Sequence, residues 1–316
     1  MARAAFRVLG LTLVAALVAH TPLTLAEDAP AAGKTWRLRY RFDAGQTVYF
    51  TVWNETVRRY QHSEVEARTR DGNDSLKHYR VMSVDAEGNA KLELTIDRTR
   101  MFAEKDSTLF QYDSQSDAQP PDGFEDVART IGRPWLHVTL NDRGEPLDFQ
   151  TPLGERVVQS PDLLSRVLPA LPEQEVAIGD VWKEPFTTEV RETETLNKPI
   201  RMQRTYRLKS VEGSVATIEF STQVLTANKT PEQDAILAQR IYSGTVTLDI
   251  DRGLMLAREL KVDQSVIGYA GAQTALTIRL DHRDEIAPGG AKTPLPATRS
   301  SAAERTAASD ALKSGN

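Results

Sequence analysis

The sequence of 316 residues contains no cysteine. This absence excludes disulfide bonds, thiolate metal sites, a cysteine nucleophile and attachment to a membrane through a lipidated cysteine. A chain without these features depends on its hydrophobic core for stability. It is long enough to form one, because domains commonly contain about 100 to 150 residues.

Clusters of Lys and Arg are also missing, and the formal net charge is -5 at pH 7. Proteins that bind nucleic acid or anionic membranes usually carry a basic patch. The nearest approach to one is the segment from Trp36 to Phe42 (WRLRYRF), in which arginines alternate with large apolar residues. This alternation predicts a half-buried strand with a solvated outer face. We therefore expect no nucleic-acid partner.

Long hydrophobic runs are scarce. The one near the N-terminus, from Val8 to Ala19, is shorter than the roughly 20 residues that a membrane span needs. Arg3 and Arg7 precede the run, and the small residue Ala26 stands at the expected cleavage site, before Glu27 and Asp28. This pattern predicts a signal peptide over residues 1–26. We expect an exported, soluble mature chain, periplasmic or extracellular, without a transmembrane segment.

Large apolar side chains are rare in two further stretches, residues 27–35 and residues 287–316. Such composition buries too little surface to offset the entropy lost on ordering. We expect a flexible linker over 27–35 and a disordered tail over 287–316. The folded domain then covers residues 36–286, with one β-rich half over 36–154 and a connecting helix plus a second half over 155–286.

The two halves repeat each other. Thr205 to Ser221 (TYRLKSVEGSVATIEFS) resembles His78 to Thr95 (HYRVMSVDAEGNAKLELT). In both, apolar residues recur at every second position on either side of a Gly-containing turn, which predicts a β-hairpin with one apolar face. Each copy also has a Gly turn and strand upstream, and a strand, Asp-Arg-Gly turn and returning strand downstream.

Each copy also carries a helix between its hairpins. In the first, Asp122 is the expected cap, with Glu125 three residues on and Gly132 at the end. In the second, Thr230 and Gln233 form the same N-terminal signature. A third helix is expected from Ser160 to Leu168, between the halves.

An apolar sheet face must be covered, by another layer or by closure of the sheet. We therefore predict a mainly β fold with a few helices, in which the duplicated antiparallel unit of strand, hairpin, helix and hairpin forms a large curved sheet or open barrel. The helices are expected on its concave side.

The segment after the third helix, LPEQEVAIGDVW, resembles a motif of an uncharacterised family of exported bacterial β-rich proteins, in which Gly-Asp-x-Trp lies between two β halves. The matching residues are Leu171, Pro172, Val176, Gly179, Asp180 and Trp182. The resemblance implies the fold and an exported location, and it implies no activity. At the level of fold alone, the chain is also similar to periplasmic lipoprotein and lipid carriers.

Three motifs admit a site, but a structural role is the better interpretation of each. Gly179-Asp180-Val181-Trp182 offers a Trp platform and a carboxylate, yet it is typical of a turn that begins a core strand. Asp142-Arg143-Gly144 and Asp251-Arg252-Gly253 resemble calcium loops, but the spacing of an EF-hand is absent and a hairpin turn explains both.

Four histidines follow the signal peptide: His62, His78, His137 and His282. None has metal-ligand spacing, and we expect scattered surface or strand positions. The sequence also has no nucleophile elbow, Walker loop or dinucleotide fingerprint. We predict no catalytic residue, no metal site and no cofactor, and the pattern does not single out the ligand-binding residues.

The least regular segment runs from Asp97 to Asp122. Long loops are uncommon unless they are functional or disordered. Phe110 and Tyr112 either close over a cavity or anchor this loop, and we favour anchoring.

Three hypotheses for function remain. The first is a non-enzymatic protein that binds a lipid or other amphipathic small molecule, or an envelope protein, and a filled interior would count against it. The second is a hydrolase of envelope polymers, which requires converging carboxyl groups with raised pKa values in a cleft. The third is a structural envelope component that associates through unprotected sheet edges.

Overall fold

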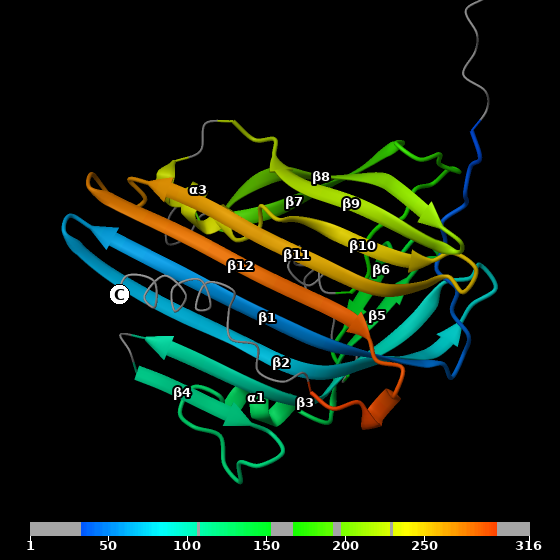
Figure 1. Cartoon of the computed structure of the whole chain (residues 1–316), viewed down its shortest axis with the longest axis horizontal. Helices are drawn as coiled ribbons and strands as arrows, with labels where there is room; N and C mark the ends of the chain where they lie inside the picture. The colour runs from blue at the N-terminus through cyan, green and yellow to red at the C-terminus, as the bar shows by residue number, and fades with distance from the viewer. Residues whose placement is uncertain (1–32, 106–107, 153–166, 192–196, 228–229, 296–316) are drawn as a thin grey trace, which may run out of the picture. The chain divides into compact units, whose positions relative to one another are not determined.

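Figure 1 shows the computed structural model of the chain, which describes residues 33–105, 108–152, 167–191, 197–227 and 230–295. The residues from Lys34 onward form one compact unit. The expected signal peptide, residues 1–26, lies outside the described residues. Within the described ranges, no helix is both long enough and apolar enough to cross a membrane.

Across the described residues, twelve strands form one antiparallel sheet (Figure 1). The strands are β1 (Thr47–His62), β2 (Val65–Val84), β3 (Ala90–Lys105), β4 (Thr108–Asp113), β5 (Pro134–Leu140), β6 (Pro146–Gln150), β7 (Val181–Arg191), β8 (Asn197–Glu212), β9 (Val215–Val224), β10 (Ser243–Asp249), β11 (Leu254–Ile267) and β12 (Thr274–Ile286). The helices are α1 (Glu125–Thr130), α3 (Pro231–Ala238) and the short 3-10 helix η1 (Gly290–Lys292). The mainly β fold is confirmed.

The strand order is β6-β5-β3-β2-β1-β12-β11-β10-β9-β8-β7, with β4 paired to the far end of β3. It shows the duplication directly, because β6-β5-β3-β2-β1 and β11-β10-β9-β8-β7 are the same arrangement of equivalent strands. β12 has no equivalent in the first half, and it joins the two copies by pairing with β1 and β11. The sheet has two ends, β6 and β7, and does not close into a barrel.

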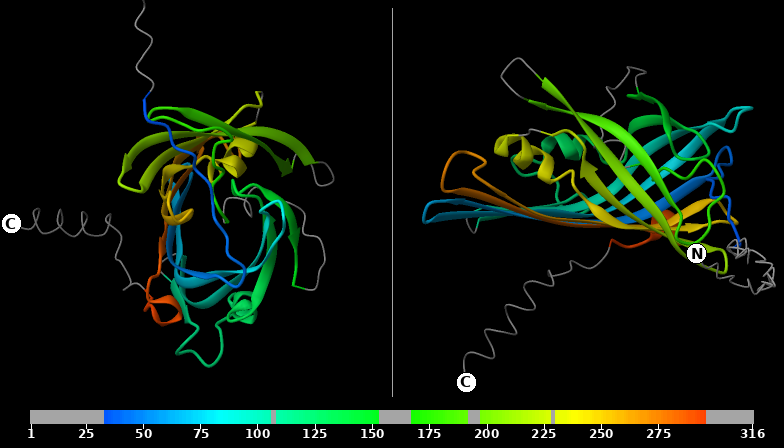
Figure 2. Two further views of the ribbon diagram at one scale, coloured as in Figure 1. Left: turned by 90° about the vertical axis from the view of Figure 1, so that its right-hand side faces the viewer. Right: turned by 90° about the horizontal axis from the view of Figure 1, so that it is seen from above.

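The sheet curves strongly (Figure 2). Along its strands, the alternating apolar residues are buried in a common core. On β9, for example, Ala216, Ile218 and Phe220 are buried, and the residues between them are not. The main hydrophobic cluster takes residues from both halves, including Val138 and Leu140 of β5 and Val246 and Leu248 of β10. The two halves therefore share one core.

The segment from Trp36 to Phe42 is not the strand that its alternation predicts. Leu38 and Tyr40 are buried as expected, but the segment has only a single bridge, between Trp36 and Val176. It crosses the end of the curved sheet that faces the viewer in the left view of Figure 2. The backbone amides of Tyr40 and Arg41 donate to turn carbonyls rather than to a strand edge.

Two of these contacts connect the segment to both copies of the Asp-Arg-Gly turn. Tyr40 N donates to Asp142 O at 2.7 Å, and Arg41 N donates to Gly253 O at 3.0 Å. Both turns have their Gly at positive φ, as the hairpin interpretation requires. The N-terminal segment thus ties together equivalent turns of the two halves.

Gly253→Ala tests this tie. A Cβ at Gly253 would lie 2.5 Å from Arg41 N, whereas Gly213, at nearly the same φ, has open space around it. We expect Gly213→Ala to lower the free energy of unfolding by about 1 to 2 kcal/mol through φ strain alone. Gly253→Ala should cost roughly 1 to 3 kcal/mol more through steric overlap. Equal losses in urea denaturation would contradict the docked position of the segment.

Helix α3 begins as predicted. Thr230 and Gln233 form a capping box, and Pro231 lies in the first turn. Leu237 is buried against β7 and β8, and Ala238 packs with residues of β11 and β12, so α3 spans the concave side.

Helix α1 differs from the prediction. Its N-cap is Phe124 rather than Asp122, no side chain caps it, and it has no buried residue. Glu125 instead accepts a hydrogen bond from Gly123 N. The six residues of α1 leave too little length for an apolar face. Most of the expected third helix, residues 160–166, lies outside the described residues.

Two segments are more ordered than their composition predicts. Part of the region from Asp97 to Asp122 completes β3 and adds β4, where Tyr112 is buried against Phe124 and Phe110 is exposed. Neither aromatic lines the cavity described below, so anchoring by Tyr112 is the role observed. In the expected tail, residues 287–295 are described, and Ala287 N donates to Tyr49 O at 2.7 Å. Residues 296–316 lie outside the described part.

Candidate ligand-binding cavity

A cavity of about 510 Å³ lies on the concave face of the sheet. Its lining comes from β1, β2, β3, β11 and β12, with Trp135 of β5, Val167 and Leu168 of the connecting segment, and Gln239 and Tyr242 just after α3. This volume is within the range of about 300 to 1,000 Å³ that is typical of small-molecule sites. The interior is therefore not filled.

One part of the lining is apolar. Its side chains come from both halves of the chain: Phe50, Val52, Tyr79, Leu94, Ile96, Trp135, Leu168, Met255, Leu260, Val262 and Leu280. Most of these residues occupy the inward phase of their strands, while Trp135 and Met255 lie at irregularities of the β3–β5 and β10–β11 ladders. Aliphatic and aromatic side chains in a preformed hollow favour an apolar ligand surface.

The other part is polar, and it centres on a buried carboxylate. Asp284 of β12 has no exposed surface, and Lys77 Nζ lies 2.7 Å from its Oδ1. Arg258 Nε donates to Asp284 Oδ2 at 2.8 Å, and His282 Nε2 lies 3.1 Å from the same oxygen. We call Lys77, Arg258, His282 and Asp284 the Asp284 cluster.

The pairing of strands brings this cluster together. Arg258 lies opposite Asp284 in the β11–β12 ladder, and Asp284 lies opposite Val52 in the β12–β1 ladder. Lys77 of β2 is opposite Phe50 of β1, one inward position from Val52. The four residues thus meet where β12 joins the two copies of the repeat.

The charges in the cluster shift its pKa values. Burial by itself would raise the pKa of the Asp284 carboxyl, but the charges of Arg258 and Lys77 and the contact with His282 hold it well below its usual range. Burial lowers the pKa of His282, and Asp284 opposes that effect only in part. These shifts favour an ionised Asp284 carboxyl and a neutral His282 imidazole at neutral pH.

A chain of hydrogen-bonded neutral side chains continues the polar lining on β1 and β2. Asn54 Nδ2 donates to Asn73 Oδ1 at 2.5 Å, and Asn73 Nδ2 donates to Ser75 Oγ at 2.7 Å. Ser75 Oγ in turn lies 2.7 Å from Thr99 Oγ1 of β3. These bonds fix amide and hydroxyl groups beside the Asp284 cluster.

A second polar network lies toward β7 and β8. The Tyr206 hydroxyl donates to Glu184 Oε2 at 2.8 Å, and Arg204 Nη1 donates to the same oxygen at 2.9 Å. The Tyr242 hydroxyl accepts from Arg204. Tyr242 is also part of the cavity lining, so this network borders the cavity on the side opposite β1 and β2.

The motifs weighed in the sequence have structural roles. Gly179 is at positive φ, and Asp180 Oδ2 accepts from Ala177 N at 2.8 Å within the turn. Trp182 stacks on Tyr206 with 5.4 Å between ring centroids, and its Nε1 donates to Ala170 O. In the second Asp-Arg-Gly turn, Arg252 N donates to Asp249 Oδ1 at 2.9 Å. No group of side chains suited to a metal ion occurs among the described residues.

The histidines divide into two groups. His62 is exposed near the end of β1, and His137 Nε2 lies 3.3 Å from Glu93, as scattered strand positions would suggest. His78 and His282 line the cavity, which the sequence did not predict. His78 Nδ1 lies 2.8 Å from Asp97 Oδ2.

A signal for the missed residues is present in the sequence. In the stretch LMLARELKV, Arg258 has the same alternation phase as Leu254, Leu256 and Leu260. In LTIRLDHRDEI, His282 and Asp284 share the phase of Leu276, Ile278 and Leu280. A charged residue in the apolar phase of a strand indicates a buried charge, which must find partners.

Among the described residues, the carboxyl groups that converge do so on a cation. Glu55 and Glu104 converge, but on Arg70, at 3.0 and 3.8 Å. Asp85, Glu232 and Asp284 all have lowered pKa values, the opposite of the shift that a general acid requires. The cavity lining, as far as the structure describes it, includes no Asp or Glu.

Comparison with known proteins finds one family and several solved structures. Residues 161–255 match the model of a family of unknown function, DUF6263. This match confirms the expected similarity to an uncharacterised family, and it includes the turn from Gly179 to Trp182. The assignment of Gly-Asp-x-Trp as a family motif stays a prediction. None of the curated proteins matches the chain.

One solved structure, described as lipid-protein interactions in lipovitellin, aligns with a TM-score of 0.44 and 11% identity over 83% of this chain. The chain spans only 27% of that protein. A second, DynF from the dynemicin biosynthesis pathway of Micromonospora chersina, aligns with a TM-score of 0.19 and 8% identity over 83% of this chain and 89% of that one. At these TM-scores the alignments carry no argument about function.

Proposed function

We propose that this chain is an exported, non-enzymatic binding protein that holds an apolar or amphipathic ligand in the cavity on the concave face of its sheet. The observation that carries the proposal is the cavity of about 510 Å³, with an apolar lining from both halves and a polar lining around the Asp284 cluster. A ligand with both kinds of surface would satisfy both kinds of lining.

The exported location is proposed from the signal-peptide pattern over residues 1–26. The two rival functions have less support. The edge strand β7 contains Pro185, and the opposite edge, β6, has five residues and starts with Pro146. The third edge strand, β4, pairs only with β3 and has six residues. Proline and short length both hinder strand addition at an edge. The carboxyl arrangement described above likewise favours binding over hydrolysis.

A cavity-filling variant tests the proposal. We expect wild-type protein to enhance the fluorescence of the neutral apolar probe N-phenyl-1-naphthylamine in a saturable way. Leu94→Trp introduces a larger side chain into the cavity lining and should weaken binding roughly tenfold or more. Leu147→Trp makes the same change at a side chain that is 50% exposed on β6, and it should bind like wild type. Probe binding that is absent in wild type, or equal in both variants, would contradict the proposal.

A further inference from the structure

The lining of the cavity has an excess of positive charge, although the whole chain is acidic. Arg58, Lys77 and Arg258 are part of the lining, and none of its described residues is Asp or Glu. The carboxylates that pair with these cations are not part of the lining: Asp71 contacts Arg58 at 2.5 Å, and Asp284 contacts both Lys77 and Arg258. A ligand in the cavity therefore meets cations and neutral donors.

Within the Asp284 cluster, one carboxylate faces two permanent cations. Both cations also line the cavity, and no Asp or Glu occurs among the described residues of that lining. A charge excess inside a low-dielectric, partly enclosed site attracts an anion more strongly than the same charge in water. The basic lining therefore favours a ligand that carries an anionic group.

Lys77 is the most exposed member of the cluster. Its side chain is 28% exposed, compared with 16% for His282 and 4% for Arg258, and Asp284 has no exposed surface. Arg258 and Asp284 together form a rigid base from two neighbouring strands, and the flexible ammonium of Lys77 lies on the cavity side of it. An ammonium has three donors and binds phosphate or carboxylate oxygens as a point charge.

The neutral groups next to Lys77 add directed donors and acceptors. Asn73 and Ser75 lie on the same strand, at successive inward positions from Lys77, and both line the cavity. On neighbouring strands the lining becomes apolar, with Phe50 and Leu94 within the same cavity. The polar and apolar linings are therefore contiguous, as one ligand with a charged end requires.

We propose that the ligand of this cavity is an amphipathic anion, whose carboxylate or phosphate group pairs with Lys77 while its apolar part lies against the residues around Phe50, Leu94 and Trp135. Asp284 is not a ligand contact in this arrangement. It is the fixed counter-ion that holds Lys77 and Arg258 in place. The inference rests on the proposed binding function and names the chemical class of its ligand.

The test compares matched ligands that differ only in the head group: dodecanol, dodecanoate and dodecyl phosphate, each used to displace N-phenyl-1-naphthylamine from the full mature chain. In wild type we expect the two anions to bind roughly 10- to 100-fold more tightly than dodecanol, as hydrogen bonds to charged groups would give. The stronger of the two anions identifies the head group. Inorganic phosphate alone serves as the control for a free-anion site.

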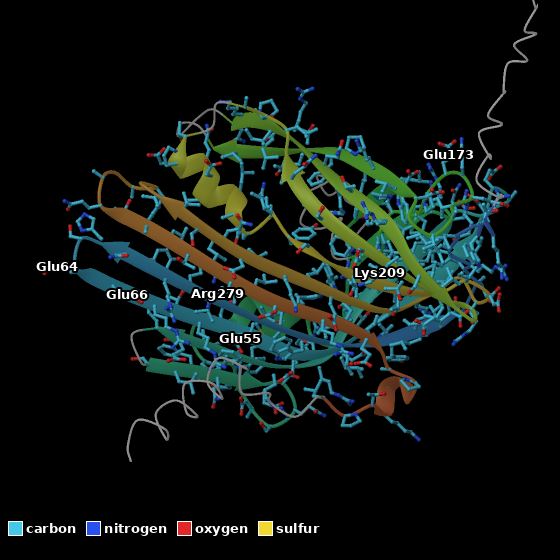
Figure 3. The ribbon with its side chains drawn as sticks, turned by 45° about the horizontal axis from the view of Figure 1, so that its top comes forward. Glu55, Glu64, Glu66, Glu173, Lys209 and Arg279 are labelled. Carbon is cyan, nitrogen blue, oxygen red and sulfur yellow. The ribbon has the colours of Figure 1, made fainter. Side chains whose placement is uncertain are left out.

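Lys77→Met retains the aliphatic part of the side chain and leaves Asp284 paired with Arg258, so the fold should persist. We expect it to reduce anion binding by about tenfold or more and to leave dodecanol binding within roughly twofold of wild type. Lys77→Arg, which keeps the charge, should retain most of the anion preference. Lys209→Met is the matched control, because Lys209 is exposed on β8 and pairs with Glu219 outside the cavity (Figure 3).

The outcomes separate the two proposals. Equal affinity for dodecanol and both anions in wild type, with no effect of Lys77→Met, would overturn the anion inference and leave the binding function intact. If wild type binds neither the probe nor any of the three ligands, the binding function itself is overturned. Displacement by inorganic phosphate as effective as by dodecyl phosphate would overturn the amphipathic part of the inference.

Discussion

Replacing Asp284 with Asn is expected to lower the free energy of unfolding by about 3 to 5 kcal/mol, because it removes the carboxylate from a buried charge cluster and leaves the cations in place. Asp284 has no exposed surface and contacts Lys77, Arg258 and His282. Asn matches its shape, so the effect isolates the charge. Urea denaturation followed by circular dichroism measures the loss.

Two variants control for this result. Asp281→Asn changes an exposed residue three positions away on β12 and should shift stability by no more than about 0.5 kcal/mol. Arg258→Met added to Asp284→Asn removes one of the buried cations and should restore part of the loss. A loss below about 1 kcal/mol for Asp284→Asn would show that the cluster is more hydrated than its burial indicates.

The same residue predicts the acid limb of the stability curve. Its pKa is lowered in the folded state, so its contribution is present above the unfolded pKa of about 3.9 and disappears as the pH falls below that value. Wild type should therefore lose stability more steeply than Asp284→Asn below about pH 4.

Tyr206→Ala is expected to cost about 3 to 5 kcal/mol, the range for truncating a large buried aromatic side chain. Tyr206 is 1% exposed and lies between Trp182, at 5.4 Å between centroids, and Phe220, at 5.8 Å. Its ring therefore packs between side chains of β7 and β9 and links these strands through β8. Its loss would leave a cavity in the main hydrophobic cluster.

Tyr206→Phe separates packing from hydrogen bonding at this position. The variant keeps both ring contacts and removes the hydroxyl that donates to Glu184 and receives from Arg204. We expect a smaller loss, about 1 to 3 kcal/mol, because the hydroxyl partners a charged pair. Thermal and urea unfolding of both variants give the comparison, and a Phe variant as unstable as the Ala variant would assign the main role to the polar network.

The regular part of the fold could be predicted because its causes are local. The hairpins follow from period-two alternation and Gly turns, and the start of α3 follows from Thr230 and Gln233. The prediction was wrong where a local pattern had a distant cause. Trp36 to Phe42 alternates like a strand, but its amides meet the turns at Asp142 and Gly253, which are far along the chain.

The candidate site could not be predicted for the same reason. Lys77 belongs to one copy of the repeat and Arg258 to the other, and β12, which carries Asp284, has no counterpart in the first half. Only the strand order brings them together. The sequence does mark Arg258, His282 and Asp284 as polar residues in an apolar phase, but alternation alone does not name their partners.

The duplication and the site therefore have different origins. The equivalent hairpins and turns of the two copies form the curved sheet. The charged lining of the cavity lies where the copies join, around β11, β12, β1 and β2. The repeated strands form the concave face that contains the cavity, and the strand that joins the copies carries part of the charged cluster.

Native mass spectrometry of the mature protein, purified without detergent and followed by solvent extraction, tests the central claim most directly. We predict a discrete additional mass on the folded protein, released on extraction as an amphipathic molecule with one acidic group, and absent from Leu94→Trp. A bare protein mass, together with no uptake of dodecanoate or dodecyl phosphate when these are added, would contradict the account.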